Sequence, residues 1–454
     1  MKRELMTLNF RRFFKAANPS RTLDMGKAED RQYYIDFSSV RGGKIIEELR
    51  RTIILADERT CQLFTGHIGC GKSTELLRLK TELEQQGFHV VYFESSQDLD
   101  MADVDISDIL LAIARQVSKS LEESKINVQP TGFKQLLQGA ARVLNAEVKG
   151  VKVKVPEVGD FGTSSKEGGE FSLAFGIGEI TAKAKDSQDI RSLLRQYLEP
   201  RVNGILEAIN KELLEPATQQ LQQQGKEGLV VIVDNLDRVD NKEKTSGRTQ
   251  PEYLFVDRGE QLNKLNCHVV YTIPLVLAFS NDLGPLTNRF GIDPKMLPMV
   301  RVKRHDGTNC ADGIASLRQM VLARAFPDID AEQRLGLIPE VFDSSETLDR
   351  LCLVSGGHVR NLLVLLYRCL QKDDPPISHD CLESVISQRR NELSLAITPD
   401  EWELLRQVAQ QKTVRGEDGY QTLLRSLFVF EYRDREAYWF DINPVLAEAK
   451  ELQG

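Results

Sequence analysis

A short glycine-rich stretch has the residue types and spacing of a phosphate-binding loop. Residues 66–74 read Gly-His-Ile-Gly-Cys-Gly-Lys-Ser-Thr and match the pattern G-x-x-x-x-G-K-[ST]. Glycines let successive backbone N–H groups turn inward around phosphate oxygens, and the helix that follows directs its positive end to the same place. Lys72 is expected to contact the β- and γ-phosphates, and the Ser73 hydroxyl to bind Mg²⁺. The stretch therefore predicts an ATP-binding site formed by Gly66, His67, Ile68, Gly69, Cys70, Gly71, Lys72, Ser73 and Thr74.

A second chemical feature is an acidic residue at the end of an uninterrupted apolar segment. Residues 229–233 read Leu-Val-Val-Ile-Val and are followed directly by Asp234. Such a run is typical of a central strand in a parallel sheet, and ligands bind beyond the carboxyl ends of these strands. Asp234 is therefore expected to hold Mg²⁺ through a water molecule, together with Ser73, as a Walker B aspartate does.

The segments around these two motifs alternate between strand and helix patterns. A short apolar run precedes the loop at residues 61–65, and others follow at 89–94, 268–273 and 299–302. Stretches with apolar residues every three or four positions lie between several of them. The pattern predicts an α/β fold, in which residues 31–305 form a P-loop NTPase core with a three-layer parallel sheet.

One segment of this core departs from the alternation. Residues 151–155 alternate valine and lysine, residues 171–185 are strand-like, and residues 162–169 are rich in glycine and serine. We expect a β-hairpin insertion at about residues 148–185 with a mobile tip. The insertion either contacts a partner or has no binding role.

The residues on either side of the core predict separate units. Residues 1–30 are expected to form a polar, irregular N-terminal arm, whose basic side chains are either solvated or in contact with an acidic partner. Residues 306–395 have a wholly helical pattern and predict a helical lid, with Arg360 in the first turn of one helix. Residues 396–454 begin with a capping box at Thr398 and read as two or three helices and a hairpin, which suggests a C-terminal winged-helix domain.

Composition argues against several classes of protein. The chain has 454 residues, of which 41% are apolar and 28% charged, as expected for a globular protein of several domains. No apolar run approaches the length of about 18 residues that a membrane span needs, so we expect no membrane contact. The seven cysteines show no C-x-x-C pairing and the six histidines do not cluster with them, which favours reduced thiols, no zinc site and a cytoplasmic location. The net charge of −8 argues against a surface coated for nucleic acid.

The order of these features, over roughly residues 30–450, resembles AAA+ ATPases of the initiator/STAND-like branch, which append a winged helix. The turn at residues 355–360, Ser-Gly-Gly-His-Val-Arg, is similar to the lid turn of that branch. The resemblance implies that Thr272 reads the γ-phosphate, that Arg360 contacts ATP from the lid, and that Arg289, in a predicted loop, is a catalytic arginine finger for a neighbouring subunit. The alternatives are that Thr272 simply ends a strand and that Arg289 pairs with a surface carboxylate.

The position after Asp234 departs from the family pattern. Many AAA+ enzymes have a glutamate there that orients the attacking water, whereas this chain has Asn235, which cannot accept a proton. Two catalytic acids remain as candidates: Asp237, which resembles the second acid of the STAND pattern, and Glu94, which ends the adjacent strand. Hydrolysis of ATP to ADP and phosphate is therefore expected to be slow, and its absence is also compatible with the sequence.

Three functions are compatible with these residues. Slow turnover favours a MgATP-dependent switch that controls self-association or contact with a protein partner. The second is a DNA-binding initiator- or transposition-type ATPase, but residues 397–454 contain seven Lys and Arg against eleven Asp and Glu, which disfavours a nucleic-acid partner. The third is a scaffold that binds ATP without hydrolysing it.

Overall fold

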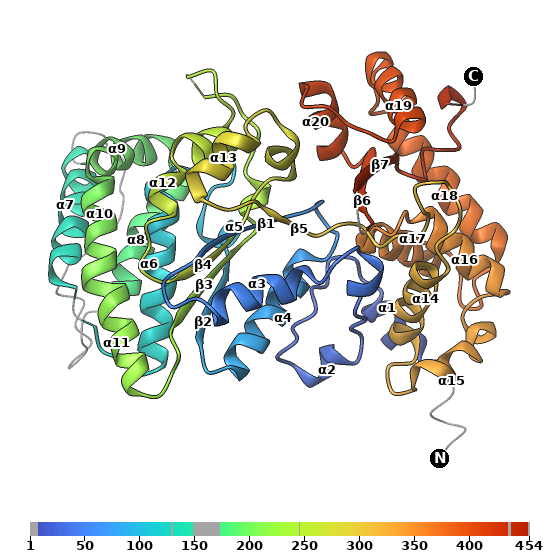
Figure 1. Ribbon diagram of the computed structural model, residues 1–454, viewed down its shortest axis with the longest axis horizontal. Coiled ribbons are helices and arrows are strands. Elements are labelled where there is room, and N and C mark those ends of the chain that lie inside the picture. The colour runs from blue at the N-terminus through green and yellow to red at the C-terminus, as the bar shows by residue number, and fades with distance from the viewer. Residues whose placement is uncertain (1–7, 129, 149–172, 245, 435–436, 453–454) are drawn as a thin grey trace.

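A parallel β-sheet carries the glycine-rich loop and Asp234 at the same edge (Figure 1). Five strands pair in the order β2-β3-β4-β1-β5, and every pair is parallel. Since β1 ends at the loop and β3 ends at Asp234, the two motifs meet where their strands end. The strands are β1 (Cys61–Thr65), β2 (His89–Glu94), β3 (Leu229–Asp234), β4 (His268–Thr272) and β5 (Lys295–Met296). The computed structural model describes residues 8–128, 130–148, 173–244, 246–434 and 437–452.

Helices cover both faces of the sheet. One buried cluster joins the sheet to α3 (Ile45–Ile54) and α4 (Lys72–Gln85), and a second joins it to helices on the opposite face. Ile232 enters the first cluster and Val231 the second, because successive side chains of a strand point to opposite faces. The predicted three-layer α/β fold is confirmed. The helices of the second face include α6 (Ile106–Glu123), α10 (Val202–Ala208), α11 (Glu215–Gln223) and α12 (Gly259–Leu262).

The strand predicted at residues 299–302 is wrong. The sheet ends instead with β5, which pairs with Phe64 and Thr65 of β1. The segment from Met299 onward runs between the lid and the C-terminal hairpin, where its apolar side chains are buried. An apolar run alone does not distinguish this position from a sheet strand. Its backbone N–H groups at Met299, Val300 and Arg301 donate to the carbonyls of Glu431, Gly357 and Val40 respectively.

The strand predicted at residues 171–185 is also wrong where the structure describes it, because α8 (Leu173–Asp186) is a helix. Leu173, Ile177 and Ile180 recur every three or four positions and are buried against α6 and its neighbours, which is a helical period rather than an alternating one. The rest of the expected hairpin, including residues 151–155 and the tip at 162–169, lies outside the described residues. The helices around it are α7 (Thr131–Val148), α9 (Gln188–Leu198), α10 and α11, drawn together on the left of Figure 1.

A set of helices follows the sheet domain in the place expected for a lid and is called the lid below, and the N-terminal segment packs on it. The segment expected to be an irregular N-terminal arm is helical at α1 (Phe10–Ala16), which buries Phe13 completely in the core of the lid, and it has no helix or strand between residues 18 and 27. No helix in the described part of the chain is long and apolar enough to cross a membrane. The lid helices are α14 (Ala311–Ala325), α15 (Ala331–Leu335), α16 (Ser345–Val354), α17 (Val359–Lys372) and α18 (His379–Ser394).

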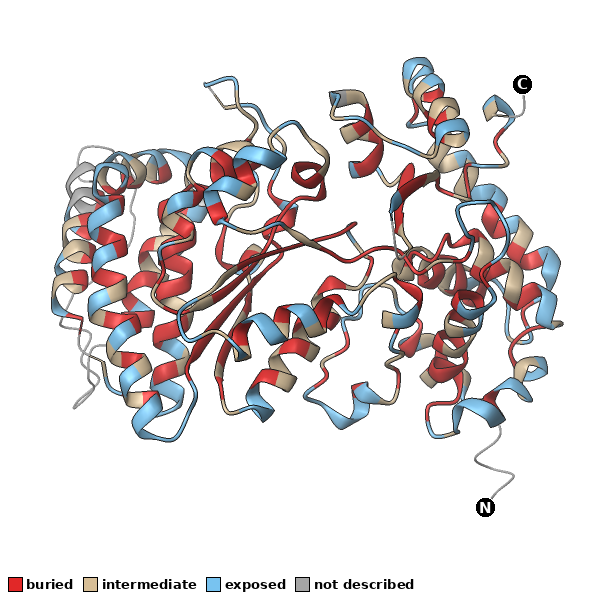
Figure 2. Ribbon diagram, in the orientation of Figure 1, coloured by how far each residue is buried: buried red, intermediate tan, exposed pale blue. Residues whose placement is uncertain are grey.

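The C-terminal unit consists of two helices and a hairpin, in the order expected from the sequence. The predicted capping box is confirmed, since Thr398 and Glu401 cap α19 reciprocally. The identification of the unit as a winged helix stays a prediction. Its hairpin does not stand free: Figure 2 shows β6 in the colour of buried residues, and Phe430 lies in the same buried cluster as α3 and α4 of the sheet domain. The elements are α19 (Pro399–Gln411), α20 (Asp418–Arg425), β6 (Val429–Arg433) and β7 (Tyr438–Ile442).

Candidate functional site

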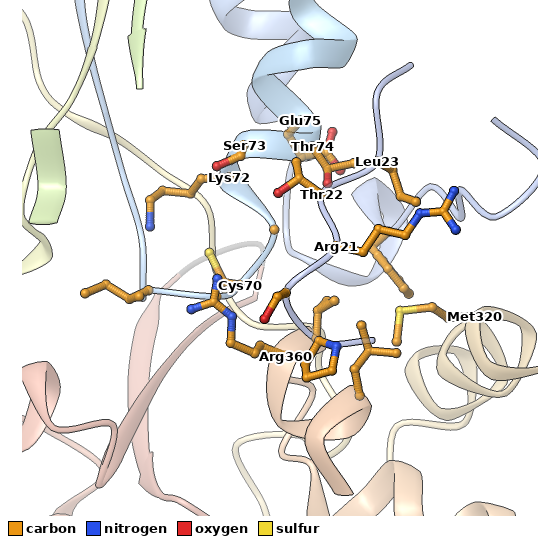
Figure 3. Close-up of a pocket in the computed structure, with 18 of the residues that line it drawn as sticks. Arg21, Thr22, Leu23, Cys70, Lys72, Ser73, Thr74, Glu75, Met320 and Arg360 are labelled. Carbon is orange, nitrogen blue, oxygen red and sulfur yellow. The ribbon is translucent and has the colours of Figure 1, made fainter. Parts of the chain in front are cut away.

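The glycine-rich loop forms the floor of a cavity between the sheet domain and the lid. Figure 3 shows the start of α4 facing the segment Arg21–Leu23, with Met320 and Arg360 of the lid on the opposite side. The wall is completed by Asn235, Asp237 and Arg238. The cavity therefore brings together the glycine-rich loop, the turn that follows Asp234, the lid arginine and the N-terminal segment.

Three loop glycines adopt backbone conformations that other residues rarely tolerate. Gly66, Gly69 and Gly71 have φ angles of 151°, 91° and 109°. Gly69 is also too close to the lid for a side chain, because a Cβ atom there would lie 2.9 Å from Cβ of Arg360. These conformations leave the loop backbone bare and start α4 at Lys72, so that the helix N-terminus faces the cavity.

Lys72 is buried and fully occupied by protein groups. Its Nζ lies 2.9 Å from an Asp237 carboxylate oxygen and donates to the carbonyls of Gly66 (2.7 Å) and His67 (2.9 Å). Burial alone would lower the pKa of Lys72, but the charge of Asp237 outweighs it and raises the pKa above its ordinary value. The lysine is therefore a charged donor that Asp237 holds in place.

Asp234 and Ser73 stand together at the end of β3. One Asp234 oxygen accepts from the Asn235 N–H (2.7 Å) and the other from the Tyr92 hydroxyl (2.8 Å). Burial raises the pKa of Asp234, and its hydrogen bond with the Ser73 hydroxyl works against that rise. Among the described residues no group of three or more His, Cys, Asp or Glu forms a metal cage. A pair of oxygen ligands of this kind suits Mg²⁺, which takes its other ligands from phosphate and water.

Thr272 lies beside this site and does not line the cavity. Its hydroxyl accepts from the Leu236 N–H (2.9 Å) and donates to the Val233 carbonyl (3.3 Å), and the residue is completely buried. It thereby fixes the 3₁₀ turn Leu236–Arg238, which presents Asp237 to Lys72. The observed bonds are those of a residue that anchors a turn, and its role as a γ-phosphate sensor stays a prediction.

Two other predicted catalytic residues are not brought into the cavity. Glu94 ends β2 beside Asp234, but it accepts a hydrogen bond from Gln97 (3.3 Å) and does not line the cavity. The prediction that Arg289 lies in a loop is wrong, because it is in the last turn of the helix α13 (Leu283–Phe290). There its Nε donates to the Val256 carbonyl (3.1 Å), and its Nη1 lies 3.7 Å from Glu260. A contact with a neighbouring subunit's nucleotide stays a prediction.

The lid turn closes directly onto the loop. As predicted, Arg360 lies in the first turn of α17, and its N–H donates to the Gly69 carbonyl (3.2 Å). His358 Nε2 donates to the Ile68 carbonyl (2.9 Å), while its Nδ1 accepts from the Asn361 N–H. Burial lowers the pKa of His358 to about 3, so the ring is neutral and its tautomer is fixed by these bonds.

Two arginines of the cavity wall were not anticipated from the sequence. Arg41, just before α3, is buried and donates to the Cys70 carbonyl of the loop (2.7 Å). Arg238 directly follows Asp237. Arg238 could have been identified from the sequence because it directly follows Asp237. Nothing in the residues around Arg41 distinguishes it from a surface arginine.

The comparisons with known proteins agree with this geometry. Residues 44–246 match the KAP family P-loop domain. The chain contains a P-loop NTPase domain. The match begins at the residue before α3 and ends beyond Asp237, so it includes the loop and both acidic residues of the β3 edge. No curated protein matches the chain.

Solved structures that are similar to the whole chain are remote. The Walker-type ATPase PABY2304 of Pyrococcus abyssi is 10% identical with a TM-score of 0.44, and the alignment covers 96% of this chain and 99% of that one. The ORC2 protein of Aeropyrum pernix, in ADPNP–ADP complexes, is 12% identical with a TM-score of 0.41, covering 98% and 97%. Likeness at this level identifies no function. The assignment of the P-loop domain comes from the family match and the sheet.

Replacing Lys72 by alanine should abolish tight nucleotide binding. Loss of a charge-assisted contact to phosphate is expected to weaken MgATP binding roughly 10- to 100-fold, measured by isothermal titration calorimetry. Lys80→Ala is the matched control, because Lys80 lies on the same helix and pairs only with Glu84 in the described structure. Unchanged affinity in Lys72→Ala would show that the loop is not the nucleotide site.

Proposed function

We propose that the protein is a MgATP-binding switch in which the nucleotide controls the position of the C-terminal unit, and thereby its self-association or contact with a protein partner. The observation that carries this proposal is a direct contact between the C-terminal hairpin and the phosphate-binding loop. The Glu431 N–H of β6 donates to Nε2 of His67, the second residue of the loop, at 3.1 Å. A change in the loop conformation would therefore alter a hydrogen bond of β6, which lies more than 350 residues away in the chain.

Aromatic and backbone contacts extend this junction to the lid. Phe430 stacks on the His358 ring, with centroids 5.4 Å apart and planes at 16°, and meets the His67 ring edge to face. The Tyr432 hydroxyl donates to the Gly356 carbonyl (2.8 Å). The hairpin therefore contacts the loop and the lid turn at one place, and displacement of either element disturbs its packing.

Nucleotide binding would change the junction through Lys72. In the structure this lysine donates to the carbonyls of Gly66 and His67. Phosphate oxygens compete for the same N–H donors, so triphosphate binding removes hydrogen bonds that hold the loop in its present form. A ligand shifts the equilibrium between two arrangements of the loop only if it binds one of them more tightly. Triphosphate would favour the arrangement in which Lys72 has left the two loop carbonyls, so its affinity for the two arrangements differs.

Mg²⁺ would be held by Ser73 and Asp234 and would neutralise charge on the phosphates. We assign the catalytic acid to Asp237 rather than Glu94, because Asp237 lines the cavity and one of its oxygens is buried without a hydrogen-bond partner. When Lys72 turns to the phosphates, Asp237 loses its counterion and becomes available to orient water.

DNA binding is less well supported than a switch. The helix that would serve as the recognition helix, α20, packs on the segment Leu275–Phe279 of the sheet domain. Its last turn offers a single basic residue, Arg425. Together with the acidic balance of the C-terminal unit, this gives little basis for phosphate contacts.

The catalytic assignment predicts a selective loss of turnover. Asp237→Asn should slow single-turnover hydrolysis of MgATP by at least about tenfold, whereas Glu94→Gln should leave the rate nearly unchanged. ATP affinity of both variants is measured in parallel, since Asp237 also positions Lys72. Equal rates in all three proteins would refute the assignment, and no turnover in the wild type would favour the non-hydrolysing scaffold.

The hairpin contact predicts a pH-dependent stability. Burial raises the pKa of the Glu431 carboxyl to about 8 from 4.5, against the opposing charges of Arg433 and Arg41, while burial lowers the pKa of the facing His67 and keeps it neutral. A carboxyl whose pKa is raised on folding stabilises the protein fully below its unfolded pKa and loses this contribution as the pH rises through its folded pKa. Stability should therefore fall between about pH 4.5 and 8, by up to about 1.4 kcal/mol per pH unit.

Glu431→Gln is expected to flatten this slope, measured as the pH dependence of the thermal unfolding midpoint. Glu403→Gln is the control, because Glu403 is exposed on α19 and pairs only with Arg406 in the described structure. A slope that survives in Glu431→Gln would contradict a neutral, docked Glu431.

A further inference from the structure

Arg238 stands at a position where two cavities adjoin. It lines the nucleotide cavity together with Lys72 and Arg360, and it also lines a second cavity bounded by Gly66–Ile68 and Arg425. It directly follows Asp237, which holds Lys72. The guanidinium is thus carried at the edge of the sheet where a phosphate bound by the loop would point.

The turn that carries Arg238 is fixed by hydrogen bonds of its own. Thr272 accepts from the Leu236 N–H, and the Arg238 N–H donates to the Asn235 carbonyl (3.1 Å). Asn235 has a left-handed backbone with φ of 65°, which asparagine tolerates better than most residues. Because the turn is anchored to the ends of β3 and β4, Arg238 has a defined place relative to the loop.

The charges around Arg238 are unbalanced. In the described part of the chain no carboxylate lies within ion-pair distance of Arg238 or Arg360, and Asp237 is taken by Lys72. Burial lowers the pKa of Arg360, the positive charge of the exposed Arg238 lowers it further, and the charge of Asp237 acts in the opposite direction. The two guanidinium groups line the same cavity and repel each other. An anion placed between two such groups removes the repulsion and adds charge-assisted hydrogen bonds.

The part of the ligand that reaches this position follows from the loop. Backbone N–H groups of a phosphate-binding loop surround the inner phosphates, the lysine reaches the β- and γ-phosphates, and the hydroxyl after it binds the metal. The terminal phosphate then points toward the end of β3, where Asp234, Asp237 and Arg238 stand in succession. A diphosphate lacks this terminal phosphate.

We infer that Arg238, together with Arg360, binds the terminal phosphate within the same chain, and that this pair is what distinguishes a nucleoside triphosphate from a diphosphate. The inference rests on the proposed function, because it requires nucleotide in the loop. It assigns discrimination to a residue outside the glycine-rich loop and needs no arginine from a neighbouring subunit.

The test compares affinities for two nucleotides by isothermal titration calorimetry with Mg²⁺ present. Arg238→Ala should weaken binding of a non-hydrolysable ATP analogue by roughly tenfold or more and leave ADP affinity within about twofold. Arg425→Ala is the matched control, because Arg425 lines only the second cavity and should change neither affinity. Arg238→Gln is measured as well, so that a folding defect specific to the alanine variant does not decide the result.

Each outcome has a separate meaning. An equal loss for both nucleotides, or no loss for either, would overturn the role of Arg238 and leave the nucleotide site itself intact. A loss of the same size in Arg425→Ala would attribute the effect to general electrostatic attraction and would also overturn it. If the wild type binds neither nucleotide, the proposed function fails and the inference fails with it.

Discussion

The loop residues Gly66 to Gly69 are contacted from three directions, through their backbone and through the His67 ring, and the arrangement of the whole molecule depends on these contacts. From within the sheet domain, Lys72 donates to the carbonyls of Gly66 and His67. From the lid, His358 donates to the Ile68 carbonyl and Arg360 to that of Gly69. From the C-terminal hairpin, Glu431 donates to the His67 ring. Each of the three units therefore uses the loop as its point of attachment.

The close contact of the three units at the loop explains why glycines stand at two of the contact points and why the buried histidines there are neutral. A side chain on Gly69 would collide with the lid, and one on Gly357 would lie 1.7 Å from the Val300 carbonyl. The close approach of the chains excludes water, and burial then keeps the pKa of His358 far below its usual range. A cation inside such a junction would be costly, so the rings act as hydrogen-bonding groups of fixed tautomer.

The same reasoning accounts for the charge distribution in the cavity. The Lys72–Asp237 ion pair is buried, and an ion pair in that position requires both partners because either charge alone would be left unsolvated. If a phosphate binds Lys72, the Asp237 carboxylate loses its counterion, and Arg238 is the cation next to it in the chain. Binding thus redistributes charge along one turn of the β3 edge, and we propose that this redistribution is transmitted through the loop to the hairpin.

Local motifs could be predicted from the sequence, whereas packing between distant segments could not. The loop, the Asp234 strand, the first turn of α17 and the capping box at Thr398 each depend on neighbouring residues, so their types and spacing were sufficient. The sequence does not determine the structure of residues 171–185 and 299–302, because an apolar segment of moderate length fits a strand, a helix or a buried linker equally well.

The largest omission has the same origin. Nothing near Phe430 or Glu431 in the sequence indicates that they lie on His67 and His358, because this contact is set by how three units close on one another. Arg289 lies in the last turn of α13, and the only local sign of that helix end is the spacing of Leu286 and Phe290 ahead of the C-cap Gly291.

Hydrogen–deuterium exchange of the β6 backbone tests the central claim most directly. The amides of residues 429–433 would be followed in the intact protein with Mg²⁺ and either ADP or a non-hydrolysable ATP analogue, with the α18 amides as an internal reference. We predict that the triphosphate analogue accelerates exchange at β6, and at Glu431 in particular, while ADP leaves it slow. Identical exchange in the two nucleotide states, at saturating nucleotide, would contradict coupling between the loop and the hairpin.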